Sequence, residues 1–355
     1  MKTMFDDDKH NKKLWTCIKS KNQEQTGIPD LKHNDKTIQD PTEKANTLNN
    51  QFASVFSDPD PEIKLESEDN VETNSMPTIK VNKNGLLKLL TNINGHKATG
   101  PDDIPGQLLK LLAYDILDVY TLLFQASLVQ GIIPNDWKRA KIMPLFKKGD
   151  KSKPENYRPV SLTSITCKLL EHIIHSNIMD HLEDHKILNS IQHGFSQKRS
   201  CESQLITAIN DFSNCLNEKG QIDSILLDFS KAFDKVDHRG LLLKLERYGI
   251  SGQFLKWMES FLFHRTQTVI VDGKESSELH VKSGVPQGTV LGPLLFLIYI
   301  NDINDDLTPG TKLRLFADDS FLYRQMKSKT DSMILQKDLE TLQKWEKMKN
   351  GVPPG

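Results

Sequence analysis

Residues Leu313–Tyr323 read Leu-Arg-Leu-Phe-Ala-Asp-Asp-Ser-Phe-Leu-Tyr, two short apolar stretches on either side of two adjacent acids. The apolar stretches are typical of strands, so Asp318 and Asp319 fall at the bend between them. Adjacent carboxylates repel each other, and a hard divalent ion with oxygen ligands is their natural partner. An ordinary surface turn is the alternative, because aspartate is common in turns.

A third carboxylate supports the metal interpretation. Asp228 ends the short apolar stretch Ser224–Phe229, which is also typical of a strand. Three acids on neighbouring strand ends suit two Mg²⁺ ions, with Mn²⁺ as a substitute, lying roughly 3.5 to 4 Å apart. One ion then activates an attacking hydroxyl and the other stabilises the leaving oxygen. Polymerases and nucleases both use such sites, so the acids alone leave both functions open.

Composition bounds the class of protein. The 355 residues, 37% of them hydrophobic, can bury a sizeable core and divide into two or three units. The net charge of −1 argues against a globally basic nucleic-acid coat protein. Four cysteines without a C-x-x-C pair indicate neither a disulfide framework nor a zinc site. No apolar run approaches the roughly 20 residues of a membrane span, so we expect an intracellular protein.

A basic stretch stands out against this near-neutral average. The stretch from Lys138 to Arg158 contains eight Lys or Arg residues and only two acids, Asp150 and Glu155. Such a patch suits the phosphates of nucleic acids or nucleotides. A solvated surface turn is the alternative interpretation.

Apolar periodicity predicts a mixture of helices and strands that does not alternate strictly, which favours the α+β class. Helices are expected over 45–56, 86–93, from 108 onward, 168–182, 202–216, 293–303 and 331–349. Strands are expected over 140–146, 157–162, 224–229, 268–271 and 279–282, the last two joined by an Asp272-Gly273 hairpin turn.

Six blocks, in order, resemble the reverse transcriptase of non-LTR (LINE-type, jockey-like) retrotransposons over nearly the whole length. They are Asn94–Pro105, Asn156–Leu162, Gln192–Phe195, Asp228–Asp234, Gly284–Leu294 and Phe316–Asp319. The resemblance implies an RNA-directed DNA polymerase with right-hand fingers and palm, the palm holding a small antiparallel sheet packed on helices. Its expected partners are an RNA template, a DNA primer and dNTPs, with no obligate protein partner inferable.

The resemblance also implies roles for single residues. Asp228, Asp318 and Asp319, with the Phe229 backbone, would hold the ions. Phe233 would lie under the incoming sugar and exclude a 2′-hydroxyl, although a core phenylalanine is the alternative. The remaining implied contacts are Arg158, Lys141 and Gln287 to the dNTP, and Lys147, Lys148 and Gly288 to nucleic acid.

Domain boundaries follow from the same reading. We expect a connecting region at 1–56, a linker at 57–77 and a reverse transcriptase domain at 78–355, with fingers at 78–220, palm at 221–330 and a C-terminal helix at 331–349. We expect no endonuclease in this sequence and, because the resemblance to the family is lost after Trp345, no thumb. A catalytically impaired relic that only binds nucleic acid is therefore an alternative. A metal-dependent nuclease is another, but it leaves Phe233 and Gln287 idle.

Overall fold

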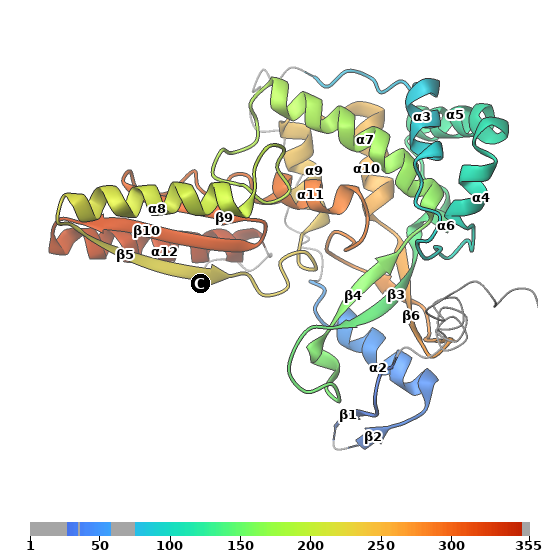
Figure 1. The fold of residues 1–355 in the computed structure, drawn as a ribbon, viewed down its shortest axis with the longest axis horizontal. Helices are drawn as coiled ribbons and strands as arrows, with labels where there is room; N and C mark the ends of the chain where they lie inside the picture. The colour runs from blue at the N-terminus through green and yellow to red at the C-terminus, as the bar shows by residue number, and fades with distance from the viewer. Residues whose placement is uncertain (1–26, 35, 58–74, 350–355) are drawn as a thin grey trace, which may run out of the picture.

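The computed structural model describes residues 27–34, 36–57 and 75–349 and has an α+β fold. Figure 1 shows three regions: a body of helices, a sheet with short N-terminal elements beside it, and an arm extending from the body. The expected class is confirmed. Most of the expected linker, and the first part of the expected connecting region at 1–56, lie outside the described residues. No helix in the described ranges is long and apolar enough to cross a membrane.

Helices of the body share one large apolar core, to which α11 contributes almost all of its residues. Pro293 stands in the first turn of α11, as expected, because proline fits there without losing a needed backbone donor. The body helices are α3 (Lys83–Thr91), α4 (Gly106–Leu111), α5 (Ala113–Gln130), α6 (Asn135–Lys138), α7 (Ile165–Asp184), α9 (His238–Arg247), α10 (Gly252–Leu262) and α11 (Leu291–Ile300).

The second region is a five-stranded sheet in the order β4-β3-β6-β7, with β8 also paired to β6. β3 pairs antiparallel with β4 and parallel with β6. α2 (Pro41–Ala53) packs on it through a smaller core that includes Leu48, Phe52 and Val269. The strands are β3 (Arg139–Phe146), β4 (Tyr157–Leu162), β6 (Arg265–Val271), β7 (Lys274–Glu275) and β8 (Leu279–Val281); β1 (Leu31–His33), β2 (Lys36–Ile38) and the 3₁₀ turn η1 (Pro154–Asn156) lie nearby. Elements from three expected domain ranges therefore meet in one place.

The expected hairpin around Asp272-Gly273 is present, but its return strand begins at Lys274 rather than Leu279. The turn exists, and its φ angles of 48° and 73° are the left-handed values that this dipeptide favours. It joins β6 to β7, however, and β8 pairs with the beginning of β6 instead. β7 and β8 run in the same direction along β6, and residues 276–278 interrupt the return strand between them.

The arm is a three-stranded antiparallel sheet held between two helices. On one face, Leu322 joins a core with Leu335 and Leu342 of α12. On the other face, Phe321 and Tyr323 contact Phe212 of α8. The elements are α8 (Cys201–Asn217), β5 (Gln221–Asp228), β9 (Thr311–Phe316), β10 (Asp319–Met326) and α12 (Lys329–Lys349), in the sheet order β5-β10-β9.

Asp211 fastens α8 to this sheet. It accepts hydrogen bonds from Lys312 at 2.6 Å, Arg314 at 2.8 Å and the Tyr323 hydroxyl. Burial favours a raised pKa, but these hydrogen bonds outweigh it and lower the pKa of Asp211 to about 2. The ionised carboxylate is therefore part of what holds the arm together.

We expect Asp211→Asn to lower the free energy of unfolding by about 2 kcal/mol near neutral pH, because charge-assisted hydrogen bonds are lost. Since the folded-state pKa lies below the unfolded one, the stabilisation is complete above about pH 4 and lost toward pH 2. Urea unfolding at several pH values should show the two proteins converging in acid. A constant difference down to pH 2 would contradict this, and Asp306→Asn, at an exposed site, is the control.

Candidate active site

Strand register brings two of the expected aspartates together. Asp319, the first residue of β10, lies directly opposite Asp228, the last residue of β5. Side chains directly opposite each other in a sheet share a face. Asp318 stands one residue earlier, in the two-residue loop between β9 and β10.

The pKa of Asp318 is raised by burial and, in part, by the other two acids. Partial burial raises its pKa most, and the negative charges of Asp319 and Asp228 raise it further. The positive charge of Lys147 offsets part of this rise. A cation placed among the three carboxylates would relieve the repulsion between them.

Carboxylate oxygens are the ligands that Mg²⁺ and Mn²⁺ prefer, so the donor set fits the expected ions. Nevertheless, no three His, Cys, Asp or Glu side chains in the described ranges converge closely enough to form a ready metal site. Asp228, Asp318 and Asp319 thus share one end of the sheet without closing around a single point.

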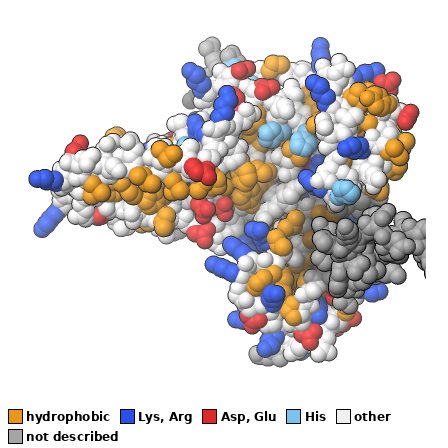
Figure 2. Space-filling view, viewed as in Figure 1, with side chains coloured by type: hydrophobic (Ala, Val, Ile, Leu, Met, Phe, Trp, Pro, Cys, Tyr) orange, Lys and Arg blue, Asp and Glu red, His pale blue; other side chains and the backbone are white. Residues whose placement is uncertain are grey.

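A cleft of about 430 Å³ separates Asp228 and Asp318 from the β3–β4 hairpin. Asp228 and Asp318 line one side, and the basic side chains of Lys147, Lys148 and Arg158 line the other. Figure 2 shows acidic side chains at the inner end of the arm and basic side chains beside them on the region of the β3–β4 sheet. The cleft therefore offers metal-binding oxygens opposite groups that neutralise phosphate charge.

Phe233 lines the same cleft, in the loop after β5. Its ring stacks on Phe296 of α11 with centroids 4.2 Å apart and meets the edge of Phe195 at 6.2 Å. The ring is only partly buried. It is thus anchored by the core while one part remains open to the cleft, and its contact with a nucleotide sugar stays a prediction.

Gln287 also lines the cleft, in the turn before α11, and forms hydrogen bonds both to the loop after β5 and to strand β4. Its side-chain amide donates to Asp234 at 3.0 Å, and its carbonyl accepts from Ser161 N of β4 at 2.8 Å. Gly288 has φ +109°, and a Cβ there would lie 2.6 Å from the Ser161 carbonyl oxygen. Glycine is required at this position by the close approach to β4.

Three expected site residues lie outside the lining of the cleft: Gly288, Asp319 and Lys141. Lys141 forms an ion pair with Asp103 at 2.9 Å and lies within 3.9 Å of Glu275. Its charge is therefore already matched by protein carboxylates.

The structure adds residues to the site that sequence reasoning did not single out. Lys231 lines the cleft with φ +57°, and buried Asp234 fixes the Gln287 side chain. Both stand inside the block Asp228–Asp234, so the block itself was the available signal. Gln192 contacts the Ala317 backbone beside Asp318 from a segment more than a hundred residues away, which no local pattern reveals.

Paired carboxylates opposite a basic wall define a site suited to metal-assisted chemistry on phosphates. Residues 146–351 match the family described as reverse transcriptase (RNA-dependent DNA polymerase). Because this match covers more than half of the 355 residues, the chain belongs to the reverse transcriptase family.

Two proteins that this chain resembles come from mobile elements of Drosophila melanogaster. The RNA-directed DNA polymerase from mobile element jockey is 31% identical over 280 residues, which are 76% of this chain and 30% of that protein. The probable RNA-directed DNA polymerase from transposon BS is 28% identical over 298 residues, 82% of this chain and 33% of that protein. The chain thus spans about a third of the length of these relatives. The resemblance to non-LTR reverse transcriptases is confirmed.

Proposed function

We propose that this chain is the polymerase part of a retrotransposon reverse transcriptase, adding dNTPs to a DNA primer on an RNA template. The observation that carries the proposal is the register pairing of Asp228 with Asp319, beside Asp318 and across the cleft from Arg158. In this proposal the arm sheet is the palm, and the β3–β4 hairpin belongs to the fingers of a right-hand polymerase.

Two Mg²⁺ ions, when bound, would lower the pKa of the primer 3′-hydroxyl and stabilise the leaving pyrophosphate. Asp228, Asp318 and Asp319, with the Phe229 carbonyl, are the residues that would hold them. Arg158 would pair with triphosphate oxygens, the electrostatic term that dominates phosphoryl transfer. Gln287, fixed by Asp234, would lie against the incoming nucleotide.

The Phe233 ring in the lining of the cleft favours nucleotide addition over phosphodiester cleavage. A nuclease needs a phosphodiester and water beside the ions but has no use for a ring under a nucleotide sugar. Phe233 lines the cleft, held on Phe296. It suits a steric check on a 2′-hydroxyl.

The proposed activity is tested with purified chain, an RNA template, a labelled DNA primer, dNTPs and Mg²⁺ or Mn²⁺. We expect the primer to lengthen by the nucleotides that the template specifies. A shortened primer would indicate a nuclease. An unchanged primer with tight RNA binding would support the relic that only binds nucleic acid.

The basic side of the cleft yields a separate prediction about binding. Lys147 and Lys148 are exposed, so replacing both with glutamate should remove about two phosphate contacts. We expect weaker RNA binding and a slope of log K against log[salt] that is shallower by about 1.5. Fluorescence anisotropy titrations at several salt concentrations measure it.

The matched control changes Lys88 and Lys110 to glutamate. These side chains are exposed on α3 and α4 and do not line the cleft. Their replacement changes the net charge equally and should alter the salt slope much less. Equal effects of the two double variants would rule out a local phosphate site on the β3–β4 hairpin.

A further inference from the structure

The loop that carries Asp318 adopts a backbone conformation that its own sequence does not favour. Phe316 pairs with Asp319, so Ala317 and Asp318 form a two-residue hairpin loop. Ala317 has φ +55°. The first position of such loops is normally glycine, asparagine or aspartate, because a Cβ clashes in the left-handed region. Something outside the hairpin must hold Ala317 there.

Gln192 supplies that support. Its side-chain oxygen accepts hydrogen bonds from Ala317 N at 2.9 Å and from Gly194 N at 2.7 Å. Its side-chain nitrogen donates to the Ala317 carbonyl at 3.2 Å. Gln192 is only 6% exposed. One buried amide thus binds both polar groups of the strained residue that precedes Asp318.

The segment around Gln192 is docked along β9. His193 N donates to the Leu315 carbonyl at 2.9 Å, and Leu315 N donates to the Ile191 carbonyl at 3.1 Å. A Cβ on Gly194 would lie 2.2 Å from Ala317 N, so only glycine permits this approach. The Gln192 amide is therefore placed by backbone contacts on both sides.

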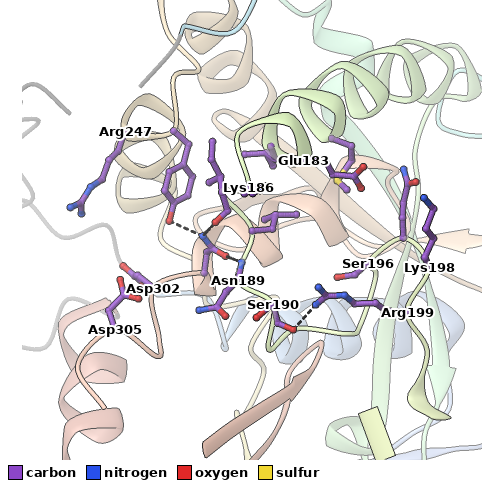
Figure 3. Close-up of a pocket in the computed structure, with 17 residues that line it drawn as sticks. Glu183, Lys186, Asn189, Ser190, Ser196, Lys198, Arg199, Arg247, Asp302 and Asp305 are labelled. Carbon is purple, nitrogen blue, oxygen red and sulfur yellow. Dashed lines mark hydrogen bonds between the residues drawn. The ribbon is translucent and has the colours of Figure 1, made fainter. Parts of the chain in front are cut away.

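Arg199 also holds the segment around Gln192, and it lies at the edge of a second cavity of about 830 Å³. Its guanidinium donates to the Ser190 carbonyl at 2.5 Å, as Figure 3 shows, and to the Gln192 carbonyl at 2.8 Å. Arg199, at the cavity edge, thus holds the segment of Gln192, and Gln192 in turn holds Ala317 in the loop before Asp318.

We propose that Gln192 is a positioning residue that sets Asp318 for metal binding. The proposal rests on the proposed function, because it assigns the metal to Asp318. Partners that orient metal ligands typically contribute 10- to 100-fold to metal affinity. Gln192 would do so through the backbone, by fixing where the loop presents its carboxylate.

The test measures the Mn²⁺ affinity of the full chain by water proton relaxation, without nucleotide, in four proteins. These are the unaltered chain, Asp318→Asn, Gln192→Met and Gln197→Met, the last at an exposed side chain in the same segment. Methionine keeps the length of glutamine but makes none of its three hydrogen bonds. We expect Gln192→Met to weaken Mn²⁺ binding about tenfold and Gln197→Met to leave it unchanged.

Adding Ala317→Gly to Gln192→Met should restore part of the affinity, because glycine adopts φ +55° without strain. A purely structural role would lower the melting temperature without this recovery. If Gln192→Met does not fold, Arg199→Met, at an exposed side chain, should still weaken Mn²⁺ binding a few-fold.

Unchanged Mn²⁺ affinity in Gln192→Met, or in Arg199→Met where that variant replaces it, overturns the inference. Unchanged affinity in Asp318→Asn instead overturns the proposed function. The two failures are therefore distinguishable in one experiment.

Discussion

Asp318→Asn is expected to slow primer extension by about a thousandfold or more. The variant keeps the size of the side chain but removes the charge that would hold a catalytic ion. An ion that stabilises charge in the transition state contributes several kcal/mol, and about 4 kcal/mol corresponds to a thousandfold in rate. Single-turnover extension of a labelled DNA primer on an RNA template, at saturating dNTP, measures the effect.

Asp306→Asn is the matched control, because Asp306 is exposed and lies outside the cleft. It should extend the primer at the unaltered rate. Primer–template affinity should be similar in both variants, since the loss belongs to chemistry. Extension by Asp318→Asn within a few-fold of the unaltered chain would remove Asp318 from the metal site.

Phe233→Val is expected to weaken discrimination against ribonucleotides by about a hundredfold, because a smaller side chain leaves room for a 2′-hydroxyl. Excluding that group by steric overlap is worth about 3 kcal/mol, on the scale by which shaped pockets reject larger substrates. The ratio of kcat/KM for dCTP to that for CTP measures the effect. The loss of the Phe296 contact makes a modest drop in melting temperature the accompanying result.

Phe254→Val is the control for a general loss of packing, because Phe254 is a partly buried aromatic on α10. It should keep the discrimination ratio while losing a similar amount of stability. An unchanged ratio in Phe233→Val, with extension intact, would assign Phe233 to the core alone.

Local sequence patterns predicted most of the helices and strands. The strand expected at 157–162 is β4, and the apolar stretch before Asp228 is the end of β5. The single helix expected from residue 108 is divided at Leu112 into α4 and α5. Exposed apolar side chains on α5, such as Leu122, blur its amphipathic face. Periodicity alone therefore did not give its length.

The sequence did not predict which strands from distant segments pair with each other. β6 lies beside β3 in parallel although more than a hundred residues separate them, and both strands pack on α2. For the same reason, the sequence predicted one part of the candidate site and missed another. Asp228 and Asp319 were expected together from their strand-end positions, whereas the Lys141 ion pair with Asp103 depends on how a distant loop folds.

The central claim is that Asp228, Asp318 and Asp319 together hold two ions for nucleotide addition. The most direct measurement counts bound Mn²⁺ by electron paramagnetic resonance, with a chain-terminated DNA primer, an RNA template and the next dNTP present. The account predicts two ions per unaltered chain and fewer in Asp318→Asn, with Asp306→Asn retaining two. A chain that binds no Mn²⁺ under these conditions, or an Asp318→Asn variant that still binds two ions, would contradict it.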